Sequence, residues 1–329
     1  MVRNNIYSFG NIPLYRYLIG AYSKYITVGK CVDFPLILHI QTQSYCNGRC
    51  SICTYRIVGK QLDQGIMEWN LYEKIVNEAV SEPLLSTFVL ELHNEPLLDK
   101  RIFDCVKYIK SMDSSKMCVF TTNGELLDNF SLTDIVQSNL DYLWVSLNAH
   151  SKETYDNMNN GLDYNRVTKN IYSLLSNNSI KQKMELSFVL TERNVHEVSE
   201  AIQYWKEQDV KTRIIGLHNR GGLLNNYENL RLKTSDRITP LLLRIWRSLM
   251  SGVRSITGCE LPFCQMNILF NGDVIVCCHD GNRAIVVGNV KTSSLRDIWN
   301  SKKMNNIRRL IIKKRSVQIT TCKECSYVR

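Results

Sequence analysis

The sequence predicts an α/β protein, because strand-like and helix-like segments alternate along most of its 329 residues. Apolar runs of strand length recur six times, and amphipathic helical patterns lie between them. Alternation of this kind is typical of βα units that form a parallel sheet. Two further strand-like runs flank Asn271-Gly272, which is a strong hairpin signal. The six predicted strands cover residues 36–42, 88–93, 117–121, 142–148, 184–191 and 212–217.

Composition favours a folded protein of the cell interior. Hydrophobic residues make up 44% of the chain and charged residues 22%, which excludes a disordered or collagen-like chain. We find no signal peptide and no apolar run long enough to span a membrane, so we expect a cytoplasmic protein. We expect residues 1–30 to form a helix packed on the rest of the protein, with an amphipathic helix on a membrane or partner as the alternative. The 12 cysteines are then metal ligands and buried thiols rather than disulfides.

The formal net charge is +10, and part of it is concentrated near the carboxyl end. Such a basic run is most often a solvated helix face. It could also steer an acidic electron donor such as a flavodoxin, or an anionic substrate. No aromatic-interleaved basic motif accompanies it, so we expect no nucleic-acid binding. The run comprises Lys302, Lys303, Arg308, Arg309, Lys313, Lys314 and Arg315.

Three cysteines follow the first predicted strand, at Cys46, Cys50 and Cys53. Three close thiolates can hold three irons of a 4Fe-4S cluster, which normally takes four cysteine ligands. No fourth cysteine lies nearby, which indicates a cluster whose fourth iron is open to another molecule. A zinc knuckle is the alternative interpretation.

Three more motifs follow in order: Asn94-Glu95-Pro96, Thr122-Asn123-Gly124 and the stretch 145–149. With the cysteine triad, they resemble the radical S-adenosylmethionine (SAM) superfamily, in which the open iron binds SAM. The resemblance implies an incomplete (β/α)6 TIM-like barrel with its active residues at the carboxyl ends of the strands. It also implies reductive cleavage of SAM to a 5′-deoxyadenosyl radical, which removes a hydrogen atom from the substrate.

The same resemblance implies a set of SAM-binding residues. Two positions depart from the family pattern: Ile52 replaces a residue that is commonly aromatic, and Asn94 replaces a glycine. Period-two alternation independently turns Trp144, Ser146, Asn148, Glu185, Ser187 and Thr191 toward the barrel lumen. The implied SAM-binding residues are Asn94, Glu95, Asn123, Ser146, Asn148 and Thr191.

The carboxyl-terminal region carries six further cysteines around the predicted hairpin. Their order resembles the SPASM/twitch extension of radical SAM enzymes, which encloses auxiliary iron-sulfur clusters. We expect one auxiliary 4Fe-4S cluster here, and Cys264 or Cys278 could replace one of its ligands. A structural zinc ribbon is the alternative. The implied ligands are Cys259, Cys277, Cys322 and Cys325.

These observations divide the chain into an N-terminal extension (1–35), a partial barrel (36–235) and a small α+β SPASM/twitch domain with a β-hairpin (236–329). Only about 35 residues precede the first strand, whereas relatives that modify peptides usually carry a leader-recognition segment there. We therefore expect a small-molecule substrate such as a sugar, an aminocyclitol or another secondary metabolite. The enzyme would oxidise or epimerise this substrate, with the auxiliary cluster as electron acceptor. A flavodoxin or a ferredoxin would be the electron donor of the enzyme.

Several alternatives stay open. A peptide or protein substrate is the second interpretation, and a non-catalytic iron-sulfur electron carrier belongs to a different class. His93, His218 and Arg220 could face the substrate, or they could have core or loop roles. Cys31, Cys105 and Cys118 are expected to be buried thiols, although an epimerase would need one thiol as a hydrogen-atom donor.

Overall fold

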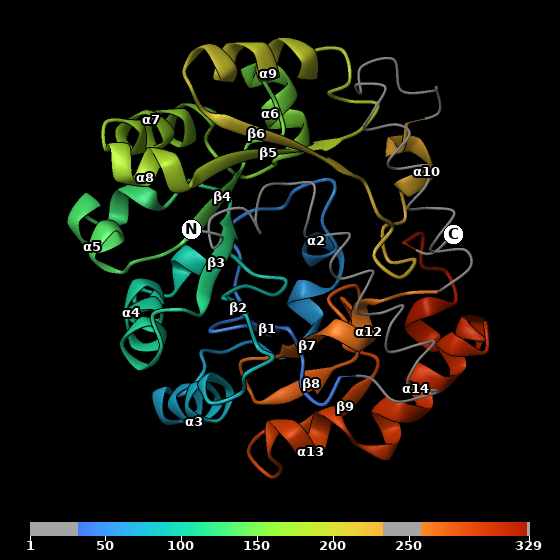
Figure 1. The fold of residues 1–329 in the computed structure, drawn as a ribbon. Helices are drawn as coiled ribbons and strands as arrows, with labels where there is room; N and C mark the ends of the chain where they lie inside the picture. Colours follow the sequence, from blue (N-terminus) through green and yellow to red (C-terminus); the bar gives the residue numbers. More distant parts are fainter. Residues whose placement is uncertain (1–31, 233–257, 328–329) are drawn as a thin grey trace.

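The computed structural model describes residues 32–232 and 258–327 (Figure 1). The predicted N-terminal helix, Cys31 and the expected domain boundary after residue 235 therefore lie outside the described residues. Within the described ranges, none of the helices is long and apolar enough to cross a membrane.

A nine-stranded sheet forms the centre of the molecule, and its first six strands confirm the predicted partial barrel (Figure 1). They lie side by side in the order β6-β5-β4-β3-β2-β1, and every neighbouring pair is parallel. Their carboxyl ends therefore meet at one end of the barrel, where an active site is expected. The strands are β1 (Ile37–Ile40), β2 (Thr87–Val89), β3 (Met117–Thr122), β4 (Tyr142–Ser146), β5 (Met184–Leu190) and β6 (Lys211–Gly216).

The predicted hairpin is present and continues the barrel sheet. Strand β7 (Gln265–Ile268) pairs in parallel with β1, and β8 (Asp273–Ile275) and β9 (Val286–Asn289) follow in antiparallel order. Gly272 has φ of 91° in the turn between β7 and β8, which favours glycine. The second cysteine-rich region is thus joined to the first strand of the barrel by backbone hydrogen bonds.

Most helices lie outside the sheet and bury one face against it, whereas the short helix α2 lies over the middle of the barrel and has no buried residue (Figure 1). In α3 the predicted positions Tyr72, Ile75, Val76 and Ala79 are buried, as the helical spacing indicates. The helices are α2 (Tyr55–Val58), α3 (Trp69–Val80), α4 (Ile102–Met112), α5 (Leu132–Gln137), α6 (Lys152–Met158), α7 (Tyr164–Leu175), α8 (Asn178–Lys183), α9 (Val198–Glu207), α10 (Tyr227–Leu230), α12 (Leu261–Cys264), α13 (Leu295–Trp299) and α14 (Lys302–Ile312).

The strands have an apolar outer face and a more polar inner face. Leu143 and Val145 of β4 are fully buried in the large core beneath the helices, together with Leu186 of β5. Ser146 and Ser187, which directly follow Val145 and Leu186, face the other side of the sheet, and their hydroxyl oxygens lie 3.3 Å apart. The period-two prediction for these two strands is therefore confirmed.

Helix α14 departs from the expectation of a solvated basic face at one position. Arg308 is fully buried, and its guanidinium carbon lies 4.1 Å from the centre of the Trp299 ring. The same guanidinium donates hydrogen bonds to the carbonyl oxygens of Pro262 (2.9 Å) and Trp299 (2.6 Å). This arginine therefore belongs to the core of the second domain, because a buried cation needs such partners.

Candidate active site and second cysteine cluster

The cysteine triad (Cys46, Cys50 and Cys53) lies in the loop between β1 and α2, at the carboxyl end of the barrel strands. Backbone hydrogen bonds anchor this loop to the connection between α6 and α7. The amide of Arg49 donates to the carbonyl oxygen of Asn160 at 2.7 Å, and the amide of Ser51 donates to that of Met158 at 2.8 Å. The three thiols are thus carried by a backbone fixed on the barrel.

The environment of the triad disfavours free thiolates. Burial, followed by the nearby charge of Glu95, raises the pKa of Cys46 to about 12. Burial and the charges of Cys53 and Cys46 raise the pKa of Cys50 further. Thiolates in such a place need a bound cation, and metal binding displaces the thiol protons. The donor set of three sulfurs at a barrel mouth therefore fits an iron-sulfur cluster.

Glu95 ties the triad loop to two strand ends. Its backbone amide donates to the carbonyl oxygen of Tyr45, next to the triad, at 2.9 Å. Its buried carboxylate accepts hydrogen bonds from the hydroxyl of Thr122 (2.6 Å) and the amides of Asn123 (2.8 Å) and Leu97 (3.1 Å). Burial raises the pKa of this carboxyl group to about 7, although these bonds oppose the shift. Glu95 is therefore positioned beside the triad.

Asn123 reaches the triad loop directly. Its side-chain amide donates to the Asn47 side-chain oxygen at 2.8 Å, and Asn47 in turn donates to the carboxylate of Glu125 at 2.6 Å. Asn47 lies between Cys46 and Cys50 in the chain, and this position was the available sign that its side chain belongs to the site. Sequence reasoning nevertheless missed both Asn47 and Glu125.

Several buried polar atoms near the strand ends have no hydrogen-bond partner among the described residues, and two of them bear on the predicted SAM site. These two are the hydroxyl of Thr42, just after β1, and the side-chain nitrogen of Asn94. The oxygen of the Asn94 side chain accepts from the amide of Leu92 at 2.8 Å. Buried polar groups are normally paired. A bound molecule with hydrogen-bonding groups would pair these two atoms, which fits the prediction that Asn94 contacts SAM.

The other predicted SAM-binding residues lie farther along the sheet. The side chain of Asn148 donates to that of Asn159 at 3.0 Å and accepts from the amide of Val189 at 2.9 Å. The Thr191 hydroxyl donates to the side-chain oxygen of Asn194 at 3.1 Å. These bonds shape the ends of β4 and β5. The structure thus connects Glu95 and Asn123 to the triad loop, with Asn94 next to Glu95 in the chain, whereas Asn148 and Thr191 are engaged in strand-end contacts.

Ionisable side chains line the inside of the barrel; the sequence predicted Glu185 there, but not Glu91 or Arg213. The carboxylate of Glu91 accepts a hydrogen bond from the hydroxyl of Thr121 at 2.8 Å, and burial raises its pKa to about 7. The Arg213 guanidinium carbon lies 4.2 Å from the centre of the Trp144 ring, and its charge opposes the rise in the Glu91 pKa. Burial similarly raises the pKa of Glu185 to about 7. Glu91 follows β2 and Arg213 lies on β6, and alternation along these two strands was the available signal for them.

His93 lies where the barrel meets the second domain. Its backbone has φ of 55°, an uncommon value for a residue with a side chain. Burial lowers its pKa to about 4, so the ring is neutral at pH 7. Its Nε2 lies 2.6 Å from the carbonyl oxygen of Cys278 and must donate to it, which leaves Nδ1 as an acceptor. This Nδ1 is buried and has no partner among the described residues.

The four predicted auxiliary ligands come together from three segments of chain. Burial raises the pKa of Cys277 well above its ordinary value, and the nearby charges of Cys278 and Cys322 add to the rise. Burial likewise raises the pKa of Cys259, to which the charges of Cys277 and Cys322 contribute. Burial, followed by the charge of Cys325 three residues along the chain, raises the pKa of Cys322 to about 12. Five thiols, Cys278 included, thus influence one another, and four of them would suffice to hold an iron-sulfur cluster.

The two remaining cysteines of this region have other surroundings. Cys264 is fully buried with Ile37, Val89 and Val119 in an apolar cluster of the barrel interior. Cys278 accepts a hydrogen bond from the side chain of Gln265 at 3.2 Å. Within residues 32–232 and 258–327, no three His, Cys, Asp or Glu side chains are grouped to hold a single metal ion.

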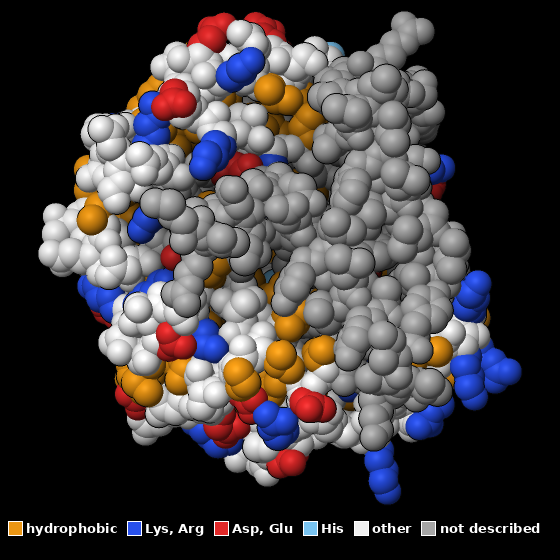
Figure 2. All heavy atoms as spheres, viewed as in Figure 1, with side chains coloured by type: hydrophobic (Ala, Val, Ile, Leu, Met, Phe, Trp, Pro, Cys, Tyr) orange, Lys and Arg blue, Asp and Glu red, His pale blue; other side chains and the backbone are white. Residues whose placement is uncertain are grey.

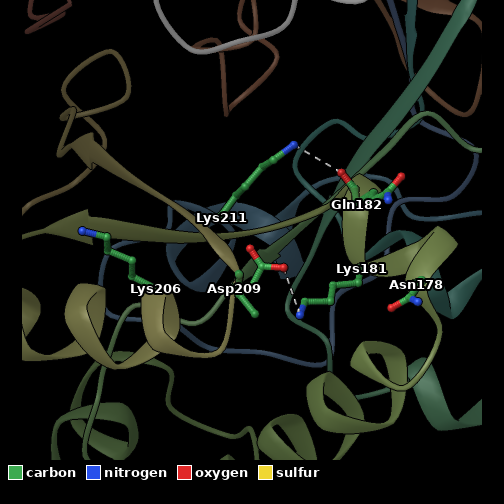
Figure 3. Close-up of a pocket in the computed structure, with 7 residues that line it drawn as sticks. Asn178, Lys181, Gln182, Lys206, Asp209 and Lys211 are labelled. Carbon is green, nitrogen blue, oxygen red and sulfur yellow. Dashed lines mark hydrogen bonds and ion pairs between the residues drawn. The ribbon is translucent and has the colours of Figure 1, made fainter.

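A surface pocket of about 250 Å³ lies elsewhere in the molecule (Figure 3). Lys206, Asp209 and Lys211 contribute to its lining, and Lys181 forms an ion pair of 3.2 Å with Asp209. Lys211 begins β6, so the pocket adjoins the amino end of that strand. It is therefore separate from the cysteine triad, which lies at the carboxyl ends of the strands.

Comparison with known families agrees with this arrangement. The sequence model of the Radical SAM superfamily matches residues 40–219, which is more than half of the chain. The model of the iron-sulfur cluster-binding domain SPASM matches residues 259–326. The chain therefore belongs to the radical SAM superfamily. It is a radical SAM enzyme that binds a 4Fe-4S cluster and SAM, and it carries a carboxyl-terminal auxiliary iron-sulfur domain.

Individual relatives are distant but match most of the chain. One is the S-adenosyl-L-methionine-dependent 2-deoxy-scyllo-inosamine dehydrogenase of Niallia circulans, 20% identical over 89% of this chain and 93% of that protein. Another is the tungsten-containing aldehyde ferredoxin oxidoreductase cofactor-modifying protein of Pyrococcus furiosus, 21% identical over 88% of this chain and 86% of that protein.

Two solved structures share the fold. BtrN in complex with AdoMet and 2-DOIA has a TM-score of 0.61 and 18% identity, over 90% of this chain and 94% of that one. Streptococcus suis SuiB bound to precursor peptide SuiA has a TM-score of 0.62 and 17% identity, over 86% of this chain and 69% of that one.

Proposed function

We propose that this enzyme oxidises or epimerises one carbon of a small molecule such as a sugar, an aminocyclitol or another secondary metabolite. When bound, the cluster and SAM supply the 5′-deoxyadenosyl radical that removes a hydrogen atom from that carbon. The observation that carries the proposal is the hydrogen-bonded connection of the cysteine triad to Glu95 and Asn123, at the carboxyl ends of the parallel strands.

In this proposal Cys46, Cys50 and Cys53 bind the first cluster, and the protein's own residues fix the place of SAM. Glu95 and Asn123 hold the triad loop against the ends of β2 and β3. The unpaired nitrogen of Asn94 supplies a hydrogen-bond donor to SAM. Ser146, Asn148 and Thr191 belong to the outer part of the same site, where they shape the ends of β4 and β5.

We assign Cys259, Cys277, Cys322 and Cys325 as ligands of one auxiliary 4Fe-4S cluster. Four thiolates fill a cluster's ligand positions, so this site would have no open iron. Such a cluster suits the removal of an electron from a substrate radical better than the binding of substrate. The burial of Cys264 in the barrel interior supports its exclusion from the ligand set.

The substrate would lie in the polar part of the barrel lumen, next to the second domain. Polar side chains there include Glu91, Arg213 and the serine pair 146 and 187, which suit a substrate rich in hydroxyl or amino groups. His93 offers the buried acceptor Nδ1 at the boundary between barrel and auxiliary domain. We assign to it a hydrogen bond from the hydroxyl group of the carbon that reacts. On oxidation of that carbon to a carbonyl group, His93 would accept the hydroxyl proton.

Support for a small molecule comes from the dehydrogenase of Niallia circulans, whose name gives an aminocyclitol as substrate and which this chain matches nearly end to end. A peptide substrate is the second candidate, and the fold shared with SuiB bound to its precursor peptide favours it. We further propose a cytoplasmic enzyme that receives its electrons from a flavodoxin or a ferredoxin.

The proposal is tested by anaerobic reconstitution with SAM, a strong reductant and a panel of deuterated cyclitols, sugars and peptides. Deuterium should appear in 5′-deoxyadenosine with a cyclitol or sugar, and mass spectrometry measures it. Transfer only from peptides would support the second candidate. Intact clusters that cycle electrons without SAM cleavage would instead indicate a non-catalytic electron carrier.

A further inference from the structure

Helix α14 ends in an exposed basic turn. Lys313, Lys314 and Arg315 follow its last residue, and all three side chains are exposed. Lys314 has φ of 58°, and the amide of Arg315 donates to the carbonyl oxygen of Leu310 at 2.8 Å, a common way to end a helix. The helix dipole favours cations near this end. It does not by itself call for three in succession.

These three cations lack acidic partners in the part of the chain that the structure describes. Some other exposed basic side chains are paired, such as Arg296 with Glu82 and Arg166 with Asp128 at 2.8 Å. Figure 2 shows lysine and arginine side chains gathered at the edge of the molecule where α14 lies in Figure 1. This turn therefore presents a positive surface that no acidic side chain of the described chain neutralises through an ion pair.

An apolar side chain sits within the basic turn. Val317 is 59% exposed, which makes it one of the most exposed large hydrophobic residues of the described chain. It lies in the short turn Ser316–Gln318, directly after the three cations. An apolar centre surrounded by charge is the usual make-up of a protein contact site. We call Lys313, Lys314, Arg315 and Val317 the basic edge.

The basic edge adjoins the second cysteine cluster. The turn that holds Val317 packs against the turn Thr320–Cys322, whose last residue is a proposed auxiliary ligand. Cys322 is only partly buried. On the other side, a Cβ on Gly258, next to Cys259, would lie 3.0 Å from the Ile311 side chain of α14. The turn that holds Val317 thus lies beside Cys322, and the end of α14 that leads into the edge lies beside Gly258.

We propose that the basic edge is the docking surface for an acidic one-electron carrier protein, a flavin or iron-sulfur protein, that exchanges an electron with the auxiliary site. The inference rests on the auxiliary cluster of the proposed function. The auxiliary site loses one electron and the oxidised carrier gains it, with no bond made or broken in either protein. Unpaired cations attract the carrier from a distance, and the small apolar centre permits a short-lived contact.

Stopped-flow mixing of the reduced holoenzyme with oxidised flavodoxin tests this surface. The absorbance of the flavin semiquinone gives the second-order rate constant. We expect this constant to fall about tenfold or more between low and high salt, because exposed charges are screened. The variant Lys313→Glu/Lys314→Glu/Arg315→Glu should lower it about 10- to 100-fold at low salt. Val317→Asp should lower it as well.

The matched control is Lys206→Glu/Lys211→Glu, at the pocket of Figure 3, which should stay within about twofold of the unaltered enzyme. Dithionite-driven SAM cleavage confirms that each variant is folded, and it tests the proposed function independently of the docking surface. A rate that does not depend on salt, or one that the triple variant leaves unchanged, would overturn the proposal. The salt dependence of the unaltered enzyme remains decisive even if a variant does not fold.

Discussion

The ring of His93 donates a hydrogen bond of 2.6 Å to the backbone carbonyl oxygen of Cys278, a residue 185 positions later in the chain. This bond joins the segment that follows β2 to the segment that carries the proposed auxiliary ligand Cys277. It also fixes which ring nitrogen carries the proton. The bond therefore links the segment that leads to Asn94 and Glu95 with the segment of the second cysteine cluster.

His93 should make the enzyme less stable in mild acid. Its folded-state pKa of about 4 lies below the ordinary value of 6.5, so the unfolded chain binds a proton that the folded chain does not. Its full contribution to stability is present above about pH 6.5 and is lost as the pH falls toward 4. Relative to His93→Asn, the unaltered enzyme should lose about 1–2 kcal/mol more of its unfolding free energy between pH 7 and 5.

Urea denaturation at both pH values measures this difference. Asparagine tolerates the positive φ of position 93, so the variant should fold. The control is His196→Asn, because the His196 side chain is 64% exposed. Equal acid sensitivity of the unaltered enzyme and His93→Asn would show that this ring is not held neutral.

The auxiliary ligand set predicts a difference among neighbouring cysteines. Cys277→Ala removes a proposed ligand, and the anaerobically reconstituted protein should lose up to about four of its eight irons per chain. Cys264→Ala should keep all of them, because that thiol is buried in the barrel interior. Iron and sulfide analysis measures both. Loss of iron from Cys264→Ala, with Cys277→Ala unaffected, would contradict the assignment.

Removing the Glu95 carboxylate should loosen the triad loop. Glu95→Ala leaves the Thr122 hydroxyl and the Asn123 and Leu97 amides without their acceptor, which should cost about 1–3 kcal/mol of stability. We also expect weaker SAM binding, measured by calorimetry on the reconstituted protein. Glu153→Ala, at an exposed position of α6, is the control. Unchanged stability and SAM affinity in Glu95→Ala would show that the loop is held by other contacts.

Arg308 should matter for stability although it lies in a basic run. Arg308→Ala removes two hydrogen bonds to buried carbonyl oxygens and the contact with Trp299, and should cost about 2–4 kcal/mol. Arg309→Ala on the exposed face of the same helix should cost less than about 0.5 kcal/mol. Thermal or chemical denaturation compares the two. If Arg308→Ala lost as little stability as Arg309→Ala, the Arg308 side chain would have to be exposed to solvent instead of buried.

The barrel and the hairpin could be predicted because their signals are local. The strands alternate apolar and polar residues, and Asn271-Gly272 marks a turn whose glycine has φ of 91°. The parallel pairing of β7 with β1 could not be predicted, because it joins segments more than 200 residues apart through backbone atoms alone. The buried place of Arg308 also depends on contacts made only in the folded chain.

For the site, the sequence indicated the cysteines and the residues at the strand ends, because each of these belongs to a short motif of neighbouring residues. It did not indicate Asn47 and Glu125, whose roles come from side-chain hydrogen bonds between distant loops. Nor did it separate Asn148 and Thr191, held by neighbouring strand ends, from Asn123, which reaches the triad loop. In the sequence all three residues are polar and lie at or just after the end of a predicted strand, so only their hydrogen bonds in the folded chain distinguish them.

SAM cleavage by the anaerobically reconstituted protein, measured as 5′-deoxyadenosine by mass spectrometry, tests directly whether the cysteine triad generates the radical. The control is the triple variant Cys46→Ala/Cys50→Ala/Cys53→Ala, with its auxiliary cluster intact. We predict reductant-dependent formation of 5′-deoxyadenosine by the unaltered protein and none by the variant. Formation at equal rates in both, or no formation by a fully loaded protein, would contradict the assignment of the triad as the site of radical generation.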